Sequence, residues 1–289
     1  MENQEKQQVL VLGGGSLVGN YLLPLLAEAG YRGYVVSRKK TDTGLNFAWL
    51  PTNEVQDASW HLHDRAVIIS LWPIWLLGPI MPQFLGASQL ITLSSTSLFG
   101  KAGSVDKNEQ ELVKKISNAE EVVRVNSETF RIPYTILRPT LIYDCVNDQN
   151  ITFIAKMIRR FGFFMVSGEA QGLRQPIHAQ DVAKAIVNSI GNTQSYNKSL
   201  NITGGETVTY FTMIRRVAEA LGSPIRIFSF PTFFLKNLLR VVRMMGLTTL
   251  SPSLFDRMNQ DLAYNGEEAV KILGLSPRDF KPEFPKDLA

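Results

Sequence analysis

The sequence predicts an α/β protein with a doubly wound parallel sheet and a smaller mixed C-terminal lobe. Short apolar runs alternate with helical stretches through the first half, and the first run leads into three glycines and a helix. The alternation weakens after about residue 139. Continuous apolar strands between helices are typical of a parallel sheet covered on both faces. With 289 residues, 45% of them hydrophobic and 19% charged, the chain has the composition of a folded protein.

The strands and helices follow in order from apolar periodicity. We expect strands at residues 8–12, 34–37, 47–50, 66–71, 89–93 and 134–137. Helices are predicted at residues 17–29, 108–129, 151–160, 179–190 and 211–221, with Gly191 and Gly222 ending the last two. There is no internal repeat or low-complexity linker. We therefore expect a sheet domain over residues 1–140 and an interleaved smaller lobe over residues 141–289.

Charge, cysteine content and hydrophobicity indicate which partners and which cellular compartment to expect. Thirty Lys and Arg against 26 Asp and Glu give a net charge of +4, spread along the chain, so nucleic-acid binding has no support. The polar start and the single cysteine, Cys145, favour a cytoplasmic protein. Residues 66–100 carry no charge, but Pro73, Pro79 and Pro82 would break a spanning helix. Two buried strands are expected there instead.

The glycine turn carries the strongest chemical signal. The residues Gly13, Gly14, Gly15, Ser16, Leu17, Val18 and Gly19 lie between the first strand and the first helix. Backbone N–H groups and the helix dipole at such a turn can hold a pyrophosphate, which predicts a dinucleotide site. The alternative is a plain tight turn. Ser16 stands where the commoner pattern has its middle glycine.

The end of the second strand indicates the type of dinucleotide. An acidic residue there would bind the ribose hydroxyls, whereas this chain has Ser37, Arg38 and Lys39. Hydrogen-bond donors and positive charge suit a 2′-phosphate, so NADP is favoured over NAD. The alternative is a solvated basic turn.

At this point the chain resembles the short-chain dehydrogenase/reductase superfamily, in the extended and atypical branch of NAD-dependent epimerases and dehydratases. Residues 91–100 (ITLSSTSLFG) resemble its fifth strand, and residues 136–143 (ILRPTLIY) resemble its sixth. Residues 175–183 (QPIHAQDVA) resemble the start of a late helix, and residues 201–205 (NITGG) the strand after it. The resemblance runs over nearly the whole chain and implies a Rossmann-like fold.

The resemblance also implies site residues. Ser95 occupies the position of the catalytic Ser/Thr, whose hydroxyl hydrogen-bonds the substrate oxygen during hydride transfer. The residues expected to line the cofactor beyond the strand ends are Ser70, Leu71, Trp72, Ser94, Pro139, Thr140 and Leu141.

The chain departs from the family in one respect. The family's Tyr-x-x-x-Lys pair, which performs proton transfer, occurs nowhere in this sequence. Residues 107–128 contain Lys114 and Lys115 but no tyrosine. Tyr143 is our candidate proton donor, with the two lysines as candidate cofactor contacts; structural roles are the alternative for all three.

Further residues are weighed singly. His178 and Arg174 are candidate substrate contacts, Arg174 for a phosphate; a half-buried histidine and a surface arginine are the alternatives. Asp181 is expected to cap or order the helix beside it. His61 and His63 have no third ligand nearby, so no metal site is predicted. Cys145 is expected to be inert.

Residues 233–245 form a basic amphipathic helix with a wide apolar face. Packing in the C-terminal lobe or a dimer contact is the favoured interpretation, ahead of a membrane surface or a substrate lid.

Three functional classes remain open. The first is an NADP-dependent oxidoreductase or epimerase that acts on a small molecule. A nucleotide-linked substrate is our candidate. The second is a dinucleotide-binding redox sensor or assembly partner without turnover. The third is a peripheral membrane enzyme with a lipid-linked substrate. The family often forms homodimers through long helices such as residues 108–129.

Overall fold

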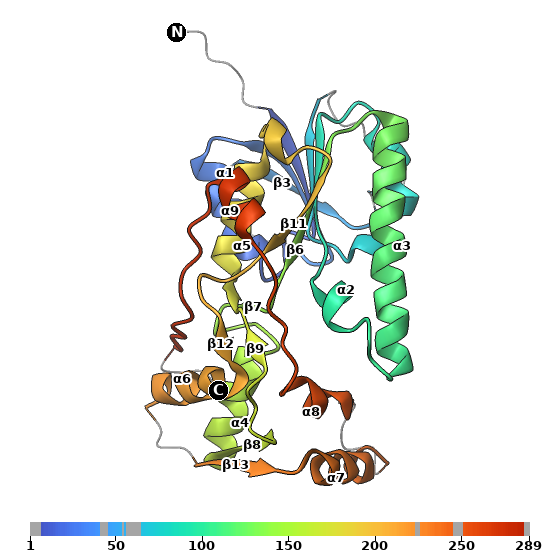
Figure 1. Ribbon diagram of the computed structural model, residues 1–289. Coiled ribbons are helices and arrows are strands. Elements are labelled where there is room, and N and C mark those ends of the chain that lie inside the picture. Colours follow the sequence, from blue (N-terminus) through green and yellow to red (C-terminus); the bar gives the residue numbers. More distant parts are fainter. Residues whose placement is uncertain are drawn as a thin grey trace.

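Seven parallel strands form the central sheet in the order β11-β6-β5-β4-β1-β2-β3 (Figure 1). This computed structural model describes residues 7–40, 46–53, 55, 65–222, 226–244 and 251–285. The predicted α/β class is therefore confirmed, and the six expected strands are present within two residues at each end. The strands are β1 (Gln8–Leu12), β2 (Arg32–Ser37), β3 (Phe47–Pro51), β4 (Val67–Ser70), β5 (Gln89–Leu93), β6 (Tyr134–Pro139) and β11 (Lys198–Ile202).

Helices cover both faces of the sheet (Figure 1). One face carries α1 (Gly19–Glu28), α5 (Ala179–Ser189) and α9 (Glu267–Leu273). The other carries α3 (Lys107–Phe130) with the 3₁₀ segments η1 (Ile74–Leu76) and η2 (Gly78–Phe84). Because successive side chains of a strand point to opposite faces, β1 feeds both cores: Val9 and Val11 join the first, and Leu10 and Leu12 the second.

The uncharged stretch 66–100 folds as predicted. It forms β4, then η1 and η2 across the three prolines, then β5 and the short helix α2 (Ser97–Gly100). Among the described residues, no helix has both the length and the apolar composition needed to cross a bilayer.

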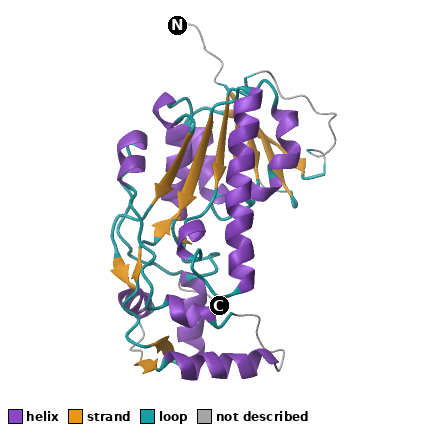
Figure 2. Ribbon diagram, turned by 45° about the vertical axis from the view of Figure 1, so that its right-hand side comes forward, coloured by secondary structure: helices purple, strands orange, loops and turns teal. Residues whose placement is uncertain are grey.

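The second half of the chain contributes to two places. It builds a smaller lobe at the carboxyl ends of the sheet strands, and it also returns to the sheet as α5, β11 and α9 (Figures 1 and 2). The predicted helices 151–160, 179–190 and 211–221 are confirmed within one residue. The remaining elements are β7 (Ile142–Tyr143), α4 (Ile151–Phe161), β8 (Phe163–Ser167), β9 (Leu173–Arg174), β10 (Ile177–His178), η3 (Thr193–Ser195), β12 (Val208–Thr209), α6 (Tyr210–Ala220), β13 (Arg226–Phe230), α7 (Thr232–Met244) and α8 (Ser253–Arg257).

A buried ion pair fixes α3 against the sheet. Glu120 of α3 accepts hydrogen bonds from Nε of Arg138 on β6, at 2.9 and 3.2 Å, and from Arg138 Nη2. The hydroxyl of Ser94, just after β5, donates to the same carboxylate at 2.5 Å. One side chain of α3 thus holds the ends of two neighbouring strands, next to the loop that carries Ser95.

Replacing Glu120 by Ala should lower the free energy of unfolding by about 3 kcal/mol, because it leaves Arg138 without its partner in a mostly buried place. Chemical denaturation followed by circular dichroism measures this. Glu121→Ala is the matched control: that carboxylate is 59% exposed and pairs with Arg124 within the same helix. Equal stability of the two variants would contradict the role given to Glu120.

Candidate active site

The glycine turn brings α1 into direct contact with the end of β1. The N–H groups of Gly13 and Gly14 both donate to the carbonyl oxygen of Val36, at 2.8 and 3.2 Å. A Cβ atom added to Gly19 would lie 2.1 Å from the carbonyl oxygen of Gly14, which real atoms do not permit. Gly13 also has a φ of +86°, a conformation that favours glycine. The turn therefore requires glycine for both contact and conformation.

The same turn leaves unused hydrogen-bond donors. Within the described part of the chain, the backbone N–H groups of Gly15, Leu17 and Val18 donate to no acceptor. Ser16 turns its hydroxyl inward and accepts from the N–H of Gly19 at 3.2 Å. The first turn of α1 holds no acidic residue. Free amides at a helix N-terminus form a site for an anion, which fits a pyrophosphate.

The three predicted cofactor residues at the end of β2 differ in their surroundings. The hydroxyl of Ser37 is already engaged, since it donates to the carbonyl of Lys39 at 2.5 Å and accepts from Trp49 Nε1 at 2.9 Å. Arg38 and Lys39 have exposed side chains. A ligand at this edge would therefore meet two cations rather than the serine hydroxyl.

The end of β4 lies beside the glycine turn. The indole of Trp72 packs on Gly13, where an added Cβ would be 2.8 Å from its Cδ1 atom. Ser70 is fully buried and its hydroxyl accepts from the N–H of Trp72 at 3.3 Å, while Leu71 packs in the core. Of these three predicted cofactor residues, Trp72 contacts the turn through its side chain, and Leu71 lies beside it through its backbone.

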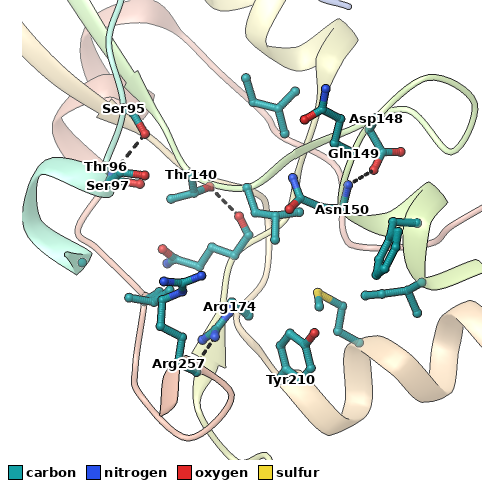
Figure 3. Close-up of a pocket in the computed structure, with 18 of the residues that line it drawn as sticks. Ser95, Thr96, Ser97, Thr140, Asp148, Gln149, Asn150, Arg174, Tyr210 and Arg257 are labelled. Carbon is teal, nitrogen blue, oxygen red and sulfur yellow. Dashed lines mark hydrogen bonds between the residues drawn. The ribbon is translucent and has the colours of Figure 1, made fainter. Parts of the chain in front are cut away.

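A cavity of about 840 Å³ lies between the strand ends and the smaller lobe (Figure 3). It begins at Leu17 of the glycine turn and passes the loop after β5, the residues after β6, and α8. Ser95, Thr140, Leu141 and Arg174, all predicted site residues, line it. Lining residues that the sequence did not indicate include Lys101, Asp148, Tyr210, Arg257 and Tyr264.

Three neighbouring hydroxyls in the loop after β5 have different surroundings. Ser94 is committed to Glu120, and the hydroxyl of Thr96 donates to the carbonyl of Pro139 at 3.1 Å. The hydroxyl of Ser95 accepts from the N–H of Ser97 at 3.1 Å and lines the cavity (Figure 3). Ser95 is thus held in place by an acceptor contact while its proton can still be donated to a bound molecule.

Arg174 is a buried cation in the cavity wall. Its side chain donates to the carbonyl oxygens of Leu173 at 2.7 Å and Gln260 at 2.8 Å, and its guanidinium lies 5.2 Å from the ring centre of Tyr210. Burial lowers its pKa. No carboxylate among the described residues forms an ion pair with it. Backbone carbonyl oxygens, including that of Arg257, accept from its donors, and an anionic group in the cavity would add a charged partner.

A second positive group lies nearby. Arg257 pairs with the buried Glu109 of α3, and Lys101 lies 3.9 Å from the same carboxylate. Burial lowers the pKa of Lys101, and the adjacent Arg257 lowers it further. Two cations therefore share one carboxylate at this wall of the cavity.

Tyr143 and His178 do not line the cavity. Tyr143 is 1% exposed, with its ring packed edge-on against His178 and Phe280, and burial strongly raises its pKa. His178 is the N-cap of α5, where its Nδ1 accepts from the N–H of Gln180 at 3.1 Å. Asp181, expected to cap or order this helix, lies in the first turn of α5 and accepts from Nε of Arg278 at 2.9 Å. These side chains therefore join α5 to β7 and to the C-terminal segment.

Lys114 and Lys115 of α3 are exposed, with the ammonium of Lys115 over the ring of Trp75 at 4.6 Å. The buried face of the helix carries Ile116 and Glu120, so α3 offers no proton-transfer pair. His61 and His63 lie outside the described residues. Elsewhere in the described ranges, no three His, Cys, Asp or Glu side chains gather as metal ligands would.

No family model and no curated protein matches the sequence. The fold, a parallel sheet covered by helices on both faces, is shared with solved structures that include several UDP-sugar 4-epimerases. The UDP-glucose 4-epimerase of Thermotoga maritima, solved with UDP-glucose, superposes with a TM-score of 0.69 at 16% identity, over 94% of both chains. The UDP-glucuronic acid 4-epimerase of Bacillus cereus, solved with NAD, gives 0.71 at 16% identity, over 94% of both chains. The UDP-N-acetylglucosamine 4-epimerase of Bacillus cereus gives 0.69 at 13% identity, over 95% of this chain and 92% of that one.

Cys145 lies just beyond β7 and tests the packing of this region. It is 2% exposed, and burial raises the pKa of its thiol to about 12. Because the thiolate is the reactive form, the native protein should not react with a thiol reagent such as dithionitrobenzoate at pH 8. Unfolded protein supplies the positive control, with one thiol per chain. Rapid reaction of the native chain would show that the lobe is packed differently.

Proposed function

We propose that this protein binds a nicotinamide dinucleotide at the glycine turn and a nucleotide-linked sugar in the cavity, and that it acts as an epimerase or oxidoreductase. One observation carries the proposal: a single cavity extends from Leu17 of the turn, past Ser95, to the buried Arg174. The amides that have no acceptor among the described residues, and the buried arginine, would serve as two separate anion sites. A dinucleotide and a nucleotide-linked substrate each bring a diphosphate.

The dinucleotide fits the residues present. Its pyrophosphate would accept from the amides of Gly15, Leu17 and Val18, with Trp72 alongside. When bound, the nicotinamide supplies the hydride acceptor and donor. The chain's part is to orient it at the strand ends, where Thr140 and Leu141 line the cavity.

Ser95 would donate its hydroxyl proton in a hydrogen bond to the substrate oxygen that changes between alcohol and carbonyl. The proton itself needs another carrier, because the chain lacks the family's tyrosine and lysine. Tyr264 is our candidate in place of Tyr143. It lines the cavity, and its hydroxyl lies 2.5 Å from where a Cβ on Gly100 would be, in the segment that follows Ser95. Lys101 is the adjacent ionisable group.

The substrate's diphosphate would lie at Arg174 and Arg257. Structural neighbours were solved with UDP-sugars, which have this chemistry. For the dinucleotide, Arg38 and Lys39 favour the 2′-phosphate of NADP. The UDP-glucuronic acid 4-epimerase of Bacillus cereus, by contrast, was solved with NAD.

Arg38→Asp should weaken NADP binding by about tenfold or more, because a carboxylate would replace a cation at the 2′-phosphate. Binding of NAD should change much less. Isothermal titration calorimetry with both dinucleotides measures the difference. Arg32→Asp, at the other end of β2, is the matched control. Equal losses for NAD and NADP would remove the NADP assignment.

Ser95→Ala and Tyr264→Phe should each reduce turnover by about 100-fold or more, since each removes a group that acts on the reacting oxygen. Dinucleotide affinity should stay within about twofold. Conversion of UDP-glucose and UDP-glucuronic acid, followed by chromatography, measures turnover, and Ser97→Ala is the control.

Unchanged turnover in Ser95→Ala would contradict the catalytic assignment. Tight dinucleotide binding by the unaltered protein, with no conversion of either UDP-sugar, would favour a binding protein without turnover.

A further inference from the structure

The helix α7 and the strand β13 lie at the end of the molecule farthest from the central sheet (Figures 1 and 2), and both carry exposed apolar side chains. On α7, Phe233 is 69% exposed and Met244 is 87% exposed. Phe234, Leu238 and Val241 are exposed as well. Five large apolar side chains of a 13-residue helix therefore face solvent. Exposed apolar patches of this kind mark interaction sites.

The orientation of α7 is fixed by its contacts with the lobe. Leu235 is 1% exposed and marks the face that packs inward. Lys236 pairs with Asp256 of α8 at 2.6 Å. At 100° per residue, Phe233, Val241 and Met244 project away from the face that Leu235 defines. The apolar surface is therefore presented outward by packing, and α7 does not cover the cavity as a lid.

The apolar surface continues from α7 onto the neighbouring strands. The rings of Phe230 on β13 and Phe234 on α7 stack with centroids 5.7 Å apart. Phe228 of β13 packs on Phe163 of β8 at 5.7 Å, and Phe163 packs on Phe161 at the end of α4 at 6.1 Å. Aromatic side chains thus extend across three further elements at the same end of the molecule.

The charged residues on the elements that form this surface have one sign. The segments α4, β8, β13 and α7 contain seven Lys and Arg and no Asp or Glu. Arg160, Arg226 and Arg240 are exposed, and none of them is ion-paired within the described ranges. Two acidic residues of other segments lie near α7: Asp256 is bound to Lys236, and Asp106 interacts electrostatically with Arg243. An apolar face bordered by unpaired cations complements a surface that is both apolar and anionic.

We propose that this surface, formed by α7, β13, β8 and the end of α4, docks the protein on an anionic lipid bilayer. The exposed phenylalanines and Met244 would enter the boundary between headgroups and acyl chains, and the arginines would meet the lipid phosphates. The helix α8, which holds α7, contributes Leu254 and Arg257 to the cavity wall, and Met258, the residue after the helix, also lines it. Docking would therefore place the cavity close to the membrane surface.

Sedimentation with vesicles tests the docking. The full chain should bind vesicles of phosphatidylcholine and phosphatidylglycerol, bind weakly to phosphatidylcholine alone, and lose affinity as salt rises. Phe233→Ser with Met244→Ser should reduce the affinity by about tenfold or more. Arg226→Gln with Arg240→Gln should reduce it by roughly fivefold per arginine. All four positions are exposed, so the variants should fold as the unaltered chain does.

Leu85→Ser with Arg32→Gln is the matched control, because both side chains are exposed near the amino ends of sheet strands, away from the smaller lobe. It should bind vesicles as the unaltered protein does. Absence of binding to anionic vesicles, or equal binding by the Phe233 and Met244 variant, would overturn the proposal. A dimer in analytical ultracentrifugation that the same substitutions dissociate would overturn it in favour of a second copy of the chain. Dinucleotide calorimetry on the same variants separates failure of docking from failure of the proposed function.

Discussion

The contact between Gly19 and the carbonyl of Gly14 determines where α1 begins, and the rest of the site depends on it. A side chain at Gly19 would push the helix away from β1. With glycine there, the helix starts directly at the strand end, and three amides of the turn have no acceptor among the residues that the structure describes. The cavity begins at Leu17, one of those three residues. One backbone contact thus joins the sheet, the anion site and the mouth of the cavity.

The sequence predicted the fold well because its signal is local. Strands buried on both faces are continuous apolar runs, and β5 and β1 begin and end at the predicted residues. Helix ends were also well placed where a glycine follows, as at Gly191 and Gly222, both with positive φ. The lobe was harder, since its two-stranded sheets pair segments far apart in the chain, such as β8 with β13.

Site residues could be predicted where they belong to a sequence motif. They could not be predicted where contacts between residues far apart in the chain bring them to the cavity. Ser95 follows a recognisable strand and lines the cavity, as expected. Arg257 and Tyr264 come from a segment without periodicity or motif, and they reach the cavity because residues 257–262 pack beside Arg174. His178 lies in a motif but serves as a helix cap. Asp181, three residues further on, binds Arg278, which is 97 residues away in the chain, so the sequence alone could not indicate this contact.

The missing tyrosine and lysine change what α3 does. Its buried face holds Glu109 and Glu120, which bind Arg257 and Arg138 and so join the lobe and the strand ends to one helix. A helix occupied in this way supports the cavity without supplying its acid or base. In the proposed function, proton transfer then falls to side chains from the loop after β5 and from the C-terminal segment. The proposed pyrophosphate site does not depend on this exchange, because its donors are backbone amides.

The most direct test of this account is to follow the backbone amide resonances of Gly15, Leu17 and Val18 by NMR while NADP is added. The account predicts that these three amides shift together and saturate with the dinucleotide, because they become donors to its pyrophosphate. If the dinucleotide leaves all three unchanged, the turn is not the binding site, and the proposed function fails with it.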